Sequence, residues 1–124
     1  MYDKPLILEE VQRVETSLQD LQKWTSHITS PDDFLLSMEG MILLNAVCMK
    51  LFAIGEEVKT IDKHTNKALL PLYPAIMWKD IMGMRDVIAH HYFELDAPKV
   101  TDTLQNDIQP LLTVIQQIKK DLSK

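Results

Sequence analysis

Polar side chains between positions 85 and 92 have the residue types that acid–base and anion chemistry need. They are Arg85, Asp86, His90 and Tyr92, and His91 lies among them. An imidazole exchanges protons near neutral pH, and a guanidinium stabilises negative charge that develops on a phosphate. The cluster therefore predicts a site at which protons are moved while a phosphate is held.

The spacing of Arg85 and His90 limits how the two can work together. On an ideal helix, two residues five positions apart have side chains about 140° apart around the axis. Either the helix loosens before the cap and proline at positions 96–98, or His90 meets a second chain. A two-fold dimer would bring two His90 and two Arg85 side chains around one groove. In the simpler interpretation His90 and His91 are ordinary polar residues at a helix end, and Arg85 forms a solvated charge pair with Asp86.

Other reactive residue types give weaker signals. Cys48, the one cysteine, lies in an apolar segment and is expected to be a small core residue, and the seven Met residues are expected to fill core space. Adjacent His90 and His91 lack the spacing of a zinc site, and no Gly-rich phosphate loop is present. The sequence therefore predicts neither a metal nor a bound cofactor.

The segments that position these residues carry helical patterns. Only three Gly are present and hairpin signals such as Asn-Gly or Asp-Gly are missing, so an all-α protein is expected. Apolar residues spaced three and four apart predict a first helix from about 5 to 27. The start signal at 30–33 predicts a second helix that runs through Met38 and Met41 to Gly55 or a little beyond.

The second half of the chain continues in the same way. Residues 59–74 lack sustained periodicity and are expected to form a loop that can hold one short helix. A third helix follows Pro74 and ends near Phe93, and a fourth runs from about 96 to the C-terminus. Pro110 should kink or break this last helix and leave a separate short helix after it. The expected result is one domain over 1–124, an antiparallel bundle of four or five helices.

Composition and charge restrict the class of partner. The 124 residues carry 13 basic and 18 acidic groups, a net charge of -5, which speaks against a broad electrostatic grip on nucleic acid. Residues 58–91 hold five basic and three acidic groups, which suits a small local phosphate site. A single cysteine, no signal-peptide pattern and no apolar run of membrane length predict a cytoplasmic protein that does not enter a membrane.

The string over positions 78–96 resembles the signature of the HepT-like toxins of the HEPN superfamily. It contains Arg-x4-His-x-Tyr, filled by Arg85, His90 and Tyr92, with a Trp seven residues before the arginine. A second similar stretch, Ile-Gly-Glu at 54–56, precedes the predicted loop. The resemblance covers nearly all of the chain from about residue 30 onward.

This resemblance implies a HEPN-like helical bundle and a metal-independent endoribonuclease that acts as a homodimer, with two motifs facing each other in a cleft. His90 would be the general acid or base at the ribose 2′-hydroxyl or the leaving 5′-oxygen. Arg85 would hold the scissile phosphate, and Asp86 and Glu56 would support these side chains. RNA supplies its own nucleophile, so the chemistry implied needs no cofactor.

The resemblance also implies a partner, a minimal nucleotidyltransferase that acts as antitoxin and can transfer AMP to Tyr92. A nucleotide on Tyr92 would add bulk and negative charge two residues from His90. The RNA substrate would be a single-stranded loop such as those of tRNA, whose backbone is accessible. Two other possibilities stay open: a non-catalytic subunit that presents a substrate to a nucleotidyltransferase, and a structural dimerisation module.

Overall fold

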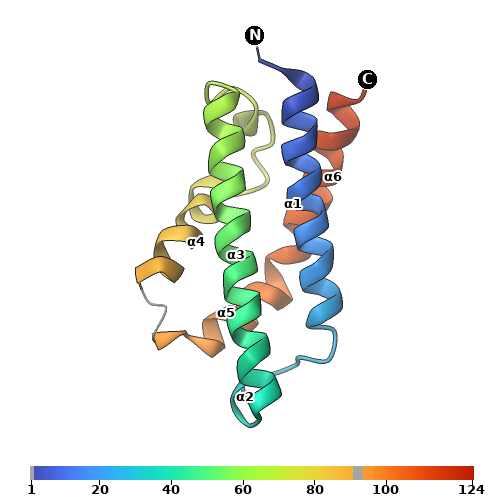
Figure 1. Cartoon of the computed structure of the whole chain (residues 1–124). Helices are drawn as coiled ribbons and strands as arrows, with labels where there is room; N and C mark the ends of the chain where they lie inside the picture. Colours follow the sequence, from blue (N-terminus) through green and yellow to red (C-terminus); the bar gives the residue numbers. More distant parts are fainter. Residues whose placement is uncertain (1, 91–93) are drawn as a thin grey trace.

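Six α-helices and one 3-10 helix make up the fold in a computed structural model that describes residues 2–90 and 94–124. These residues contain no strand, so the all-α prediction is confirmed. The two long helices α1 and α3 run along the length of the molecule, and both termini lie at the same end (Figure 1). In chain order the helices are α1 Lys4–Trp24, α2 Asp32–Leu35, α3 Met38–His64, η1 Leu70–Leu72, α4 Trp78–His90, α5 Ala97–Asn106 and α6 Ile108–Leu122.

The first helix ends slightly earlier than predicted. The Asp3 carboxylate caps its first turn. At the other end the hydroxyl and the N–H of Thr25 both donate to the Leu21 carbonyl oxygen, at 2.6 and 3.0 Å. The helix therefore ends at Trp24 and not at the predicted His27.

The predicted second helix consists of two helices, α2 and α3, with a sharp turn between them. Ser37 is extended, with φ -142° and ψ 159°, and its hydroxyl oxygen accepts a hydrogen bond from the Gly40 N–H at 2.9 Å. Gly40 also lets the corner close, because a Cβ there would lie 2.7 Å from the Phe34 carbonyl oxygen. The prediction of one continuous helix is wrong because this cap interrupts it.

α3 also extends past the predicted end near Gly55, as far as His64. The predicted loop at 59–74 is therefore wrong over its first part. Val58 and Ile61 are buried and continue the three and four spacing of the core stripe. The remaining loop contains the short helix η1, as predicted.

The predicted break in the last helix is confirmed, although it lies before Pro110. α5 ends at Asn106, and Asp107 separates it from α6, in which Pro110 is the third residue. The N–H groups in the first turn of a helix have no intrahelical acceptor, so the missing N–H of Pro110 costs no bond there. The proline thus favours a helix start just ahead of it.

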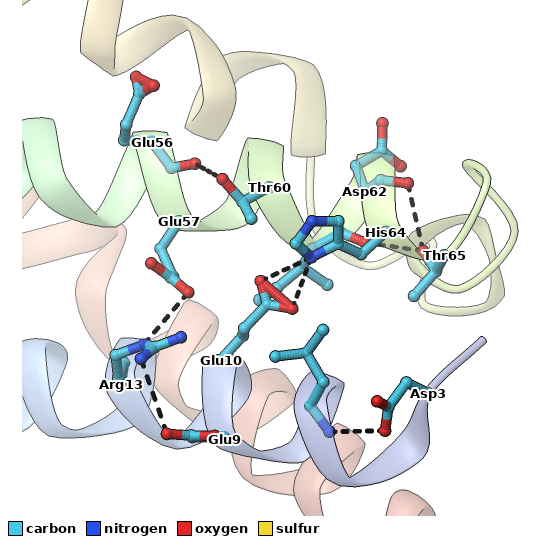
Figure 2. A network of polar contacts seen from close by, with 12 residues as sticks. Asp3, Glu9, Glu10, Arg13, Glu56, Glu57, Thr60, Asp62, His64 and Thr65 are labelled. Atoms are coloured by element: carbon cyan, nitrogen blue, oxygen red, sulfur yellow. Dashed lines mark hydrogen bonds and ion pairs between the residues drawn. The ribbon is translucent and has the colours of Figure 1, made fainter.

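Polar contacts hold α1 between α3 and α6. Glu10 of α1 is only 1% exposed, and its carboxylate accepts hydrogen bonds from Nδ1 of His64 in α3 at 2.9 and 3.0 Å (Figure 2). On its other side α1 meets α6, where Nζ of Lys119 donates to Oε1 of Glu15 at 2.9 Å. These contacts fix α3, which carries part of the candidate site, against the first helix.

α3 is long and apolar enough to cross a membrane by length and composition alone, since its most apolar 18-residue window has a mean hydropathy of 1.5. The core helix of a bundle meets the same criterion, and α3 packs against both α1 and α4. Asn45 and Lys50 interrupt it, so the helix holds no continuous apolar run of that length.

Candidate catalytic site

α4 meets α3 at the stretch Ile54-Gly55-Glu56. Ile54 is buried in the core, Glu56 is exposed, and Gly55 between them faces α4. A Cβ on Gly55 would lie 3.0 Å from the carbonyl oxygen of Ile81 and 3.1 Å from the backbone nitrogen of Arg85. The missing side chain therefore lets the two helices approach closely at the residue that carries the guanidinium.

Trp78 anchors the start of α4. Its ring is buried, and its Nε1–H donates a hydrogen bond to the Tyr73 carbonyl oxygen at 2.9 Å. The Tyr73 hydroxyl in turn donates to Asp121 of α6 at 2.6 Å; burial and then this hydrogen bond raise the pKa of Tyr73 to about 12. The helix is thus held two turns before Arg85, which gives the Trp-x6-Arg spacing a structural role.

Two carboxylates hold the side chain of Arg85. Its Nε–H donates to Oε2 of Glu56 at 2.7 Å and its Nη1 to Oδ1 of Asp86 at 2.8 Å, while Cζ lies 5.5 Å from the centre of the Phe52 ring. The bonds to Asp86 and Glu56 raise the pKa of Arg85, and the bond from Arg85 lowers the pKa of Asp86. The three other N–H groups of Arg85 have no partner within the described part of the chain, so they are available to a phosphate.

His90 is held by the backbone of Asp86. Its Nδ1 lies 2.7 Å from the Asp86 carbonyl oxygen, and because a carbonyl only accepts, this bond assigns the ring proton to Nδ1. In the neutral ring Nε2 then has a lone pair that can accept a proton from a substrate. His90 is exposed, so solvent and large molecules have access to its ring.

The structure brings three predicted site residues into contact and links the fourth to them indirectly. Glu56 and Asp86 both bind Arg85, whereas His90 contacts only the Asp86 backbone of this group. α4 stays α-helical through His90, so the loosening that would join Arg85 and His90 is not observed in the described helix. Within one chain the side chains of Arg85 and His90 therefore point in different directions from α4, as their five-residue spacing predicts.

The remaining predicted residues do not enter this group. Tyr92, the expected acceptor of AMP, lies outside the described residues, as does His91. Cys48 is buried in the core, as predicted, and burial raises its pKa to about 11, which makes it a poor nucleophile. Within residues 2–90 and 94–124, no three His, Cys, Asp or Glu side chains gather where a metal ion could bind.

The outward face of α3 before the site is mainly apolar, with Asn45 as an exposed polar residue within it, which the helical pattern did not predict. Met38 and Met41, expected in the core, are 78% and 52% exposed, so that expectation is wrong. Together with exposed Ile42 and Met49 they form what we call the apolar stripe, which runs at helical spacing toward Phe52. The opposite face of α3 is also aliphatic and takes the core side, so apolar residues alone did not distinguish the two faces.

Comparisons with known proteins point to one family. The family model described as Ribonuclease HepT-like matches residues 14–118. The chain is 37% identical over 114 residues to "Putative RNase MJ0125" of Methanocaldococcus jannaschii, an alignment that covers 90% of this chain and 95% of that protein. It is 27% identical over 107 residues to "Probable ribonuclease HepT" of Thermococcus cleftensis, with 86% and 90% covered. No solved structure matches the chain.

Proposed function

Since the chain belongs to the HepT-like ribonuclease family, we propose that it is the toxin of a toxin–antitoxin pair, an endoribonuclease that cleaves RNA without a metal ion. The observation that supports this most is the group in which Glu56 and Asp86 hold Arg85 while His90 lies on the Asp86 carbonyl. This group combines a fixed phosphate-binding cation with an accessible general base. RNA cleavage requires both functions.

RNA carries its own nucleophile, the ribose 2′-hydroxyl. Nε2 of one His90 takes the proton from this hydroxyl, and the 2′-oxygen attacks the phosphorus atom. The bond between phosphorus and the 5′-oxygen breaks as the new bond forms. A second imidazole protonates the leaving oxygen, so the products are a 2′,3′-cyclic phosphate and a 5′-hydroxyl. Arg85 stabilises the added negative charge on the pentavalent phosphate through its unengaged N–H groups. Because the nucleophile comes from the substrate, no step requires a metal-bound water.

A second copy of the chain supplies the second imidazole in this proposal. The apolar stripe is the surface that such a copy would cover, because exposed apolar side chains along one helix face are typical of a subunit interface. The stripe runs toward Phe52, whose ring lies against Arg85. A two-fold axis through the stripe would therefore place both Arg85 residues and both His90 residues at the border of one interface.

We assign the regulation of this site to Tyr92 and to a minimal nucleotidyltransferase that acts as antitoxin. The Tyr92 hydroxyl would attack the α-phosphate of ATP, form a bond to AMP and release pyrophosphate. The support is the position of Tyr92 in the sequence, two residues after His90. AMP there adds bulk and negative charge next to the place where the RNA phosphate must bind.

Cleavage of single-stranded RNA by the purified chain, in the presence of a chelator, tests the catalytic proposal. We expect 2′,3′-cyclic phosphate ends, and we expect His90→Ala or Arg85→Ala to lower the rate by about 100-fold or more. His27→Ala changes an exposed histidine in the connection between α1 and α2, outside the helices that carry the candidate site, and should keep full activity.

Two outcomes would contradict this assignment. Full activity of a folded His90→Ala variant would show that His90 is not catalytic. A chain that binds a nucleotidyltransferase and accepts AMP at Tyr92, but cleaves no RNA, would instead support a non-catalytic, substrate-presenting subunit.

A further inference from the structure

The outward face of α3 changes character at the candidate site. Before Phe52 it holds the apolar stripe, whereas beyond Glu56 it holds Lys59 and Lys63. Glu56, Lys59 and Lys63 are spaced three and four apart, so they lie on one side of the helix, one turn after another. Both lysines are exposed. The same face therefore carries a surface suited to burial at one end and a row of cations at the other.

In the part of the chain that the structure describes, no ion pair includes Lys59 or Lys63. Lys59 nevertheless lies near the site, because its charge adds to the larger effect of Arg85 in lowering the pKa of Asp86. The row of cations thus begins beside the group that holds the guanidinium.

An unpaired row of cations beside a phosphate-binding guanidinium suits a chain of phosphates. Four residues of α-helix advance about 6 Å along the axis, which is comparable with the separation of neighbouring phosphates on an extended strand. A single row contacts one backbone, which favours a single strand over a duplex with two. The two carboxylates of the candidate site, Glu56 and Asp86, are already bound to Arg85 and so repel such a strand less.

We propose that Lys59 and Lys63 bind the backbone phosphates of single-stranded RNA next to the scissile phosphate, so that the substrate runs along the C-terminal half of α3. This inference rests on the ribonuclease function proposed above. Phosphate contacts position a nucleic acid without reading its bases. The two lysines therefore raise the affinity for RNA but do not select a cleavage sequence.

Binding of a fluorescently labelled, fully 2′-O-methylated single-stranded RNA tests this inference. The methyl groups block the internal nucleophile, so binding is measured without cleavage. For the intact chain and for Lys59→Gln, Lys63→Gln and the double variant, Kd is measured by anisotropy over a range of salt concentrations. Gln resembles Lys in helix propensity, so the variants should fold normally. Lys23→Gln changes an exposed lysine at the far end of α1 and is the matched control.

We expect each site substitution to reduce the slope of log Kd against log salt by about 0.7, and the double variant by about twice that amount. The control should keep the slope of the intact chain. For cleavable RNA, KM should rise several-fold in the double variant while kcat changes less than about twofold.

If the double variant keeps the slope of log Kd against log salt of the intact chain, the inference is wrong. If this variant also loses binding to the antitoxin, the lysines contact a protein partner instead. Lysine-dependent binding by a chain that cleaves no RNA would support the inference and count against the proposed ribonuclease. If the intact chain does not bind the methylated RNA, the lysine row is not an RNA contact.

Discussion

Asp86 holds Arg85 with its side chain and His90 with its backbone carbonyl. A substitution of the Asp86 side chain therefore removes one contact and keeps the other. The two functions assigned to the site, phosphate binding and proton transfer, can be separated at this one residue. The Glu56 carboxylate contributes only to the first of them, because among the described site residues it binds Arg85 and not His90.

Asp86→Ala should lower kcat about tenfold, because Arg85 loses one of the two carboxylates that hold its guanidinium. The pKa of Asp86 is lowered and that of Arg85 is raised by their shared hydrogen bond. Both groups therefore stay charged between about pH 5 and pH 9 and contribute no limb to the pH–rate profile in that range. The profile is measured with single-stranded RNA, with Asp80→Ala as an exposed control on the same helix. An unchanged kcat in Asp86→Ala would show that Glu56 alone is enough to position the guanidinium.

Cys48 should react slowly with iodoacetamide while the chain is folded. Alkylation requires the thiolate, and burial raises the pKa of Cys48 from 9.0 to about 11, so that the thiolate is about 100-fold scarcer near pH 8. Mass spectrometry of the folded chain and of the chain in urea measures both rates. Similar rates in the two conditions would contradict the buried position of this residue.

At the scale of helices, the sequence predicts position and buried face best where a helix has a single apolar face and capping residues that mark the same ends. α1 has such a pattern and is found close to its expected position. α4 begins after Pro74 as expected, and its expected end near Phe93 lies outside the described residues. α3 is apolar on two faces, so periodicity placed Met38 and Met41 on the wrong one. The motif identified Arg85 and Glu56, but their contact depends on the approach of two helices at Gly55, which no local pattern contains.

Gly55→Ala should destabilise the fold by about 1–3 kcal/mol and reduce RNA cleavage. Its Cβ would press on the backbone of Ile81 and Arg85 and move the guanidinium away from Glu56. Gly83→Ala is the matched control on α4, because a Cβ at that position would meet none of the described atoms within 4 Å. This substitution should stabilise the helix by about 0.5–1 kcal/mol. Urea unfolding measures both effects. Equal stability of the two variants would show that α3 and α4 adjust easily at this contact.

At the scale of the whole molecule, the apolar stripe predicts self-association. Light scattering should give twice the 14.3 kDa mass of one chain. Ile42→Lys places a charge on the stripe, where the side chain is 64% exposed, and should yield monomers with little ribonuclease activity. Leu72→Lys changes an equally exposed apolar residue on η1 and should leave the dimer intact. A dimeric and fully active Ile42→Lys variant would place the interface elsewhere.

The packing of α6 against α1 also affects when a newly made chain can complete its fold. Glu15 and Lys119 are joined although 104 residues separate them, and Gln22 and Gln109 are joined over 87. During synthesis the side of α1 that packs against α6 stays uncovered until α6 has left the ribosome, after every candidate catalytic residue. A polypeptide that stops before α6 contains the complete motif but lacks one of the two helices, α3 and α6, that cover its first helix. Such fragments should be substrates for cellular proteases before they can act on RNA.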